Sequence, residues 1–145
     1  MNGLVLLLTI AGRRAALPTA EVHSVVELDA LVPVPQAPGF VIGLSALRSN
    51  TLTVIDAAAA IGLAAPARPP AGARAAIVDH AGHRYALVVD DILDVAEQFS
   101  EPCPVPGEAG PGWQRASQGL IETAHGPALL LSLEVLLAGP APLAA

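Results

Sequence analysis

Short apolar runs alternate with turn residues along the chain, and this pattern predicts β-strands rather than long helices. The runs at residues 4–10 and 75–78 have strand length, and Gly12 and Gly82 follow them. Glycine at such a place suits a tight hairpin loop, so the apolar residues beyond each glycine are expected to return as partner strands. The expected strands are 4–10, 15–17, 22–25, 52–55, 75–78, 85–89, 92–95 and 129–131.

Two segments carry helix signals instead. Asp56 and Ser132 can each accept a hydrogen bond from a free N–H group of a helix start, and Gly62 and Gly139 can end those helices. The expected helices are 57–61 and 133–138. The chain is therefore expected to be mainly β, with two or three short helices.

An internal repeat relates the two halves. Residues 11–27 match residues 81–97 without a gap, and seven of the 17 aligned positions are identical. A repeated strand pattern of this kind indicates a duplication. Pro and Gly crowd residues 64–73 and 100–117, which predicts surface loops without a central strand. We expect one domain over residues 1–140 and a frayed tail at 141–145.

Composition narrows the class of protein. Of the 145 residues, 53% are hydrophobic and 3% aromatic, so a core can form from aliphatic side chains. No apolar run approaches the roughly 18 residues of a membrane span, and the start of the chain lacks the basic segment of a secretory signal. A single cysteine, Cys103, agrees with the cytoplasm. The net charge of −6 disfavours nucleic acid as a partner.

Residues 36–56 resemble the signature of the CheW family of bacterial chemotaxis proteins, in which an apolar segment with a Leu-Arg pair precedes a strand ending in Asp. The matching residues are Pro38, Phe40, Gly43, Leu47, Arg48 and Asp56. Asp90, with Ile92 and Val95, resembles a second segment of the family, and Gly119 stands where the family has a glycine before its last hairpin. The similarity covers about residues 4–138.

The resemblance implies an all-β fold of two intertwined, five-stranded, SH3-like β-barrel subdomains. They would span about residues 11–63 and 74–138, with an N-terminal strand at 4–10. It also implies a non-catalytic adaptor that couples chemoreceptors to the histidine kinase CheA. A groove between the subdomains would dock the receptor's cytoplasmic tip, and an apolar edge would bind the CheA regulatory domain, which would recruit the protein to receptor arrays at the membrane. The implied binding positions are Val22, Ser24, Gly43, Arg48, Ile92, Val95 and Gly119.

The chain departs from the family at three positions. The family's Asn and Gly on either side of the Leu-Arg pair are Ala46 and Ser49, and a Glu in the third strand is Ser24. Loss of that carboxylate leaves Arg48 to find another acceptor and can alter the receptor surface. With Ser49 in place of glycine, the positive φ of the turn is expected at Asn50.

Other chemistry has less support. The carboxylates at 90, 91 and 94 lack the spacing of a calcium loop, and His80 and His83 are too few for zinc, so no metal or cofactor is expected. Ser45 and Cys103 lack the context of an activated nucleophile, so no catalytic residue is assigned. Trp113 can be either an exposed interface anchor or a packing residue.

Alternatives remain open for the function and for several residues. Arg48 can be a solvated turn residue, and the predicted binding side chains of Val22, Ile92 and Val95 can be ordinary core. The chain can also be a divergent CheW-like scaffold for another signalling kinase, or a small barrel that binds a ligand or a nucleic acid.

Overall fold

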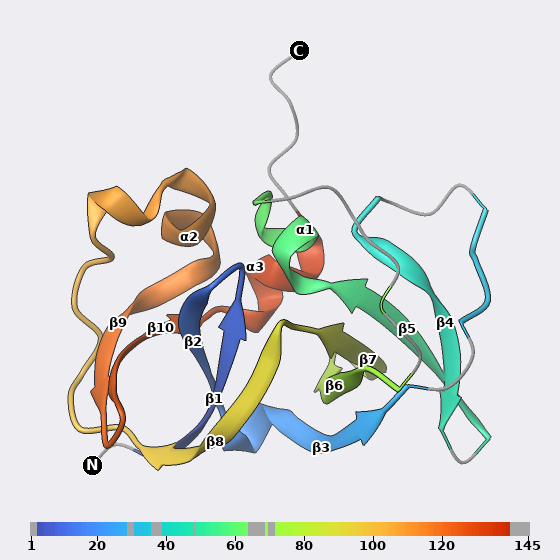
Figure 1. The fold of residues 1–145 in the computed structure, drawn as a ribbon, viewed down its shortest axis with the longest axis horizontal. Helices are drawn as coiled ribbons and strands as arrows, with labels where there is room; N and C mark the ends of the chain where they lie inside the picture. The colour runs from blue at the N-terminus through green and yellow to red at the C-terminus, as the bar shows by residue number, and fades with distance from the viewer. Residues whose placement is uncertain are drawn as a thin grey trace.

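The chain folds into two five-stranded sheets that exchange one strand each (Figure 1). The structure is a computed structural model that describes residues 3–28, 31–35, 39–47, 49–63, 69 and 72–139, with only the backbone of Leu47. Sheet A has the strand order β8-β1-β2-β10-β9, and sheet B has the order β3-β6-β7-β5-β4.

The strands of sheet A are β1 (Leu4–Ile10), β2 (Arg13–Pro18), β8 (Asp91–Glu97), β9 (Ser117–Thr123) and β10 (Gly126–Leu131). Those of sheet B are β3 (Val22–Glu27), β4 (Val41–Leu47), β5 (Asn50–Asp56), β6 (Arg74–His80) and β7 (His83–Val88). The helices are α1 (Ala57–Ile61), α2 (Pro111–Ala116) and α3 (Leu133–Ala138), with 3₁₀ turns η1 (Thr19–Glu21) and η2 (Gly107–Ala109). The predicted fold, mainly β with two intertwined five-stranded units, is confirmed.

The internal repeat relates the two sheets. If each of β1 to β5 is exchanged with its counterpart among β6 to β10, the strand order of one sheet becomes that of the other. Counterparts are 70 residues apart in the first three strands, as in Gly12 and Gly82, and 76 apart later, as in Gly43 and Gly119. The third strand of each half joins the other half's sheet, since β3 pairs with β6 and β8 pairs with β1.

The predicted hairpins are confirmed and are nearly identical. Both central residues of each turn have positive φ, at 50° and 80° for Ala11 and Gly12 and at 51° and 81° for Ala81 and Gly82. This is the turn type whose twist matches that of antiparallel strands. In the first half, the Asp90 carboxylate also accepts a hydrogen bond of 2.8 Å from the Gly12 N–H group.

Helices α1 and α3 have the predicted bounds. The Asp56 side chain accepts a hydrogen bond from the Ala59 N–H group, and Gly62 takes the left-handed conformation at the end of α1. Ser132, in contrast, makes no capping bond with its side chain, and its carbonyl accepts from the Leu136 N–H group instead.

Two sequence expectations need correction. The positive φ of the β4–β5 turn is at Ser49 (71°) and not at Asn50, because Asn50 already pairs with Leu47 as the first residue of β5. The segment 100–117 is more than a surface loop, because it contains η2 and α2. Trp113 on α2 is 2% exposed, so of its two readings the packing contact is correct.

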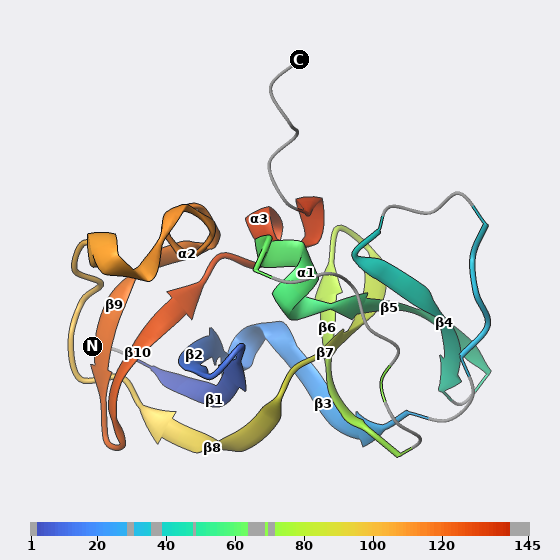
Figure 2. The ribbon, with the colours of Figure 1, turned by 45° about the horizontal axis from the view of Figure 1, so that its top comes forward.

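Three apolar clusters hold the fold together. One lies within sheet A and includes Val5, Leu7 and Ile121, and another within sheet B includes Leu52 and Ile77. The largest, called the central cluster here, joins both sheets to the three short helices, which gather where the sheets meet (Figures 1 and 2). Its larger members are Leu6, Leu8, Ile10, Leu17, Ile55, Ile61, Leu87, Ile92, Trp113, Leu129, Leu131, Leu133 and Leu136.

Candidate functional site: the crossing strands

The exchanged strands β3 and β8 cross between the two sheets at the face of the molecule opposite the helices (Figures 1 and 2). Each is an edge strand of the sheet that it joins, and each connects the two sheets. Most of the predicted binding positions with side chains lie on these two strands, namely Val22, Ser24, Ile92 and Val95.

Val22 and Ile92 are counterparts, 70 residues apart, and both belong to the interior. Ile92 is 7% exposed within the central cluster, and Val22 is half-buried against it. Their packing accounts for apolar side chains at both positions without a partner protein. A direct binding role for either residue remains a prediction.

Val95 lies at the surface, 46% exposed, and its counterpart Val25 is 37% exposed. Val95 pairs with Leu6 and Val25 with Ala76, and both of these partners belong to the central cluster. Directly paired residues share a face of a sheet, so the two valines extend the central cluster to the solvent.

Leu4, 50% exposed, lies two residues from Leu6 on the same face of β1. Leu4, Val25 and Val95 together are called the seam surface here. Sequence reasoning missed Val25, although the repeat register pairs it with Val95.

Ser24 faces a different environment. It pairs with Ile77, which belongs to the cluster within sheet B, and a β-bulge separates it from Val22. Its half-buried side chain is therefore on the other face of β3 from Val25. The structure does not group Ser24 with the seam surface.

Gly43 and Gly119 lie on β4 and β9, which end the strand order of each sheet opposite to β3 and β8. Their φ angles are +156° and +155°, and a Cβ atom would meet the Val32 carbonyl oxygen at 2.9 Å and the Cys103 carbonyl oxygen at 2.6 Å. The residues that follow the glycines exchange two backbone hydrogen bonds of 2.8–2.9 Å with Val32 and with Cys103. Each glycine thus lets a loop pair closely with an edge strand, and any binding role of the two glycines remains a prediction.

Arg48 lies outside the described residues, as does Pro38 of the family-like segment. Its role as a binding residue remains a prediction from the resemblance. The adjoining Ser49 is exposed at the tip of the β4–β5 hairpin.

The side chains considered for metal binding or catalysis either make hydrogen bonds within the protein or lie apart from one another. Asp90 holds the Gly12 N–H group, and Asp91 and Asp94 accept from the N–H groups of the residues that follow them. Within the described part of the chain, no group of three His, Cys, Asp or Glu side chains is placed to hold a metal ion. Ser45 is buried on β4, and Cys103 is exposed with its Sγ atom 3.8 Å from the Glu101 carbonyl oxygen.

The fold is a β-protein of two five-stranded sheets, with exposed apolar side chains on β1 and on the two strands that cross between the sheets. A family model described as the CheW-like domain matches residues 4–141, so the chain belongs to the CheW-like domain family. The crystal structure of the scaffolding protein TtCheW from Thermoanaerobacter tengcongensis is similar, with a TM-score of 0.76 and 24% sequence identity. The match covers 94% of this chain and 88% of that chain.

No curated protein matches the sequence. None of the helices in the described ranges is long and apolar enough to cross a membrane.

Proposed function

We propose that this protein is a non-catalytic adaptor that couples chemoreceptors to the histidine kinase CheA. The observation that carries the proposal is the seam surface, whose exposed valines occupy counterpart positions on the two exchanged strands, β3 and β8. Valine at these positions offers contact area without reactive groups, which suits a partner rather than a substrate. The seam surface receives the receptor's cytoplasmic tip, and a separate apolar edge receives the CheA regulatory domain.

The adaptor therefore works in the cytoplasm at receptor arrays and needs no cofactor. Arg48 is proposed to contribute a charged contact at the receptor interface, with an acceptor from the partner in place of the Glu that is Ser24 here.

Binding measurements with purified receptor hairpins and with the CheA regulatory domain test this function. Val95→Glu should weaken receptor binding at least about tenfold, because it places a carboxylate in an apolar contact. Leu63→Glu is the matched control, since Leu63 is also partly exposed (37%) but follows α1 on the helix side of the molecule. Arg48→Glu should weaken receptor binding as well.

The CheA arm is measured with the same variants and should be less affected by Val95→Glu. If the wild-type protein binds neither partner, the coupling function is refuted. If Leu63→Glu weakens receptor binding as much as Val95→Glu does, the receptor does not use the seam surface.

A further inference from the structure

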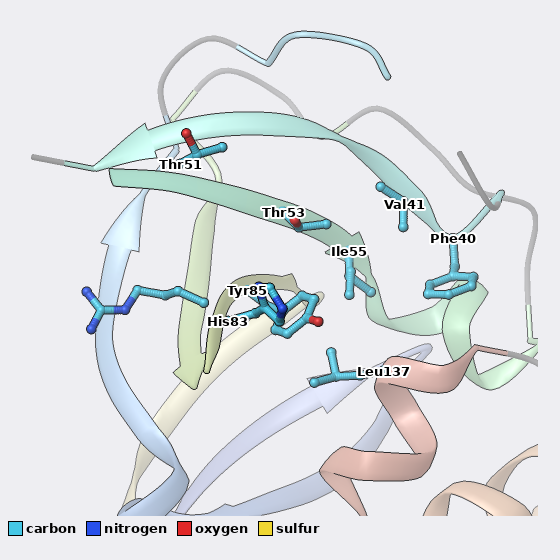
Figure 3. A pocket seen from close by; sticks show the side chains of 9 residues that line it. Phe40, Val41, Thr51, Thr53, Ile55, His83, Tyr85 and Leu137 are labelled. Atoms are coloured by element: carbon cyan, nitrogen blue, oxygen red, sulfur yellow. The ribbon is translucent and has the colours of Figure 1, made fainter. Parts of the chain in front are cut away.

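A groove opens on sheet B between β5, β7 and α3 (Figure 3). Its volume is about 540 Å³, within the range of ordinary binding pockets. Phe40, Ile55, Tyr85 and Leu137 form its apolar wall. All but Ile55 are only half-buried, although they pack against the central cluster.

The corresponding place on sheet A is covered. In the repeat, the counterparts of the four wall residues Phe40, Ile55, Tyr85 and Leu137 are, in the same order, Ala116, Leu131, Ala15 and Ile61. All four of these counterparts are at most 1% exposed.

The cover over sheet A is α2, which packs against β9, α1 and α3. Trp113 on α2 is buried in the central cluster. The approach is close, because a Cβ atom on Gly112 would lie 2.6 Å from the Ile61 carbonyl oxygen.

Sheet B has no such cover among its described residues. The chain between β3 and β4 forms a turn at Gly39 and Phe40 before β4, and its described part contains no helix. In the sequence, the 76-residue register sets Ala37 against Trp113, so the first half has no indole at this position. The groove is thus the place that a helix and a tryptophan occupy in the other half.

The polar rim of the groove shows what chemistry an occupant needs. Thr51, Thr53, His83 and Arg84 line it, and none of the described lining residues of the groove is a carboxylate. The Arg84 Nε atom lies 2.9 Å from Asp79 Oδ1, which leaves its two Nη groups for another acceptor at this exposed site. The Nη groups of Arg84 can therefore bind a carboxylate of the occupant at this rim, although the chain as a whole has a net charge of −6.

We propose that the groove docks a short helix of a partner protein, which places one large aromatic side chain against Phe40, Tyr85 and Leu137 and a carboxylate beside Arg84. The helix takes the place that α2 takes over sheet A. This site shares no residue with the seam surface, so it adds a further partner to the adaptor and does not depend on the coupling function.

The test uses a synthetic alanine-rich helical peptide of about 16 residues, with one Trp and a Glu one turn away. It is titrated into the ¹⁵N-labelled full chain and followed by NMR. Amide signals of Thr51, Thr53, Tyr85 and Leu137 should shift, and those of Val25 and Val95 should not. Replacing the peptide's Trp by Ala should weaken binding about 30-fold or more, as for an interface hot spot.

Protein variants provide matched controls. Thr53→Trp fills the groove with an indole of the chain itself and should abolish peptide binding. Arg84→Glu should weaken it about threefold to fivefold, whereas Arg14→Glu, at the counterpart position on sheet A, should leave it unchanged. Both arginines are at the surface, so these two variants keep the test valid if Thr53→Trp fails to fold.

Three outcomes would overturn the proposal. The first is the absence of shifts at the groove at about 1 mM peptide, a concentration that detects weak binding. The second is an equal loss of binding in Arg84→Glu and Arg14→Glu. The third is binding only after removal of residues 140–145, which would identify the chain's own tail as the occupant.

Discussion

Sheet A and sheet B have equivalent strands, hairpins and edge glycines. They differ in the connection that leads into the strand with the edge glycine, which is β9 in sheet A and β4 in sheet B. The connection from β8 to β9 contains η2 and α2. Trp113 and Arg115 on α2 contact the place where α1, α2 and α3 meet, called the helix junction here. The connection from β3 to β4 places Phe40 beside the same junction, with its ring against Gly139. The comparison teaches that the paired strands preserve the duplicated register, whereas a connection outside the sheets can gain a helix without disturbing them.

The largest test of this comparison removes the aromatic side chain from each connection. Trp113→Ala should cost about 3–5 kcal/mol in the free energy of unfolding, because it empties a buried site in the central cluster. Phe40→Ala should cost about 1–2 kcal/mol, since the ring is only half-buried. Urea unfolding followed by circular dichroism measures both. Equal losses would show that the two connections stabilise the fold equally.

The edge glycines test the part of the comparison that the two sheets share. Gly119→Ala should cost about 2–4 kcal/mol and Gly43→Ala about 1–3 kcal/mol, from backbone strain and overpacking. The order follows from the contacts, because a Cβ atom at Gly119 meets both the Cys103 oxygen (2.6 Å) and Pro102 Cβ (2.7 Å), but at Gly43 one atom at 2.9 Å.

Hydrogen exchange at Leu120 and Leu44 should report loss of the adjoining backbone pair in each case. Gly12→Ala, at a left-handed residue with no atom within 4 Å of the added carbon, measures the strain of positive φ alone. A cost at Gly119 no greater than that at Gly12 would contradict the close approach.

The sequence predicted the features that a pattern of residues carries by itself. The hairpin glycines and the Asp56 cap each depend on a few neighbouring residues, the repeat depends on a direct match of two segments, and the structure agrees with all three. Whole-chain topology, the exchange of β3 and β8, was reached through the family resemblance and not through the pattern of residues.

What the sequence could not predict depends on tertiary contacts. Helix α2 begins at a proline inside a Pro/Gly-rich segment, and its burial comes from α1 and α3, which are distant in sequence. The seam surface needed the pairing partners of Val25 and Val95, and the positive φ at Ser49 needed the register of β4 and β5.

Arg115 is a further contact that no motif indicated, and it links α2 to the ends of both other helices. Its Nη1 atom donates to the Gly139 carbonyl (2.9 Å), and Nη2 donates to the carbonyls of Ala60 (3.3 Å) and Ile61 (3.0 Å). A cation at two helix C-termini also interacts favourably with their dipoles.

Arg115→Met should therefore cost about 1–3 kcal/mol, since it leaves partly buried carbonyls without their donor. Arg14→Met is the control, because Arg14 is exposed and bonds only the His125 carbonyl among the described contacts. Thermal unfolding of the two variants gives the comparison. A loss of stability in Arg14→Met as large as that in Arg115→Met would mean that the contacts of Arg115 with α1 and α3 stabilise the fold no more than the surface contact of Arg14 does.

The smallest expected effect concerns Glu21 and its counterpart Asp91. Asp91 is exposed, and its carboxylate accepts from the Ile92 N–H group. The Glu21 Oε1 atom is buried without a hydrogen-bond partner among the described residues. Burial raises the pKa of Glu21 above its ordinary value of 4.5, and the nearby His80 acts in the opposite direction. The folded state thus holds the Glu21 proton more tightly than the unfolded state does.

Because the folded protein binds this proton more tightly, wild-type stability should fall as the pH rises from 4.5 through the higher pKa of the folded state. Glu21→Gln removes that titration, so its stability relative to wild type should be greater near pH 7 than near pH 4. Urea unfolding of both proteins across this range gives the difference, with Asp91→Asn as the counterpart control. A difference that is constant with pH would mean that Glu21 is as well solvated in the folded state as in the unfolded chain, and this contrast between the two halves would disappear.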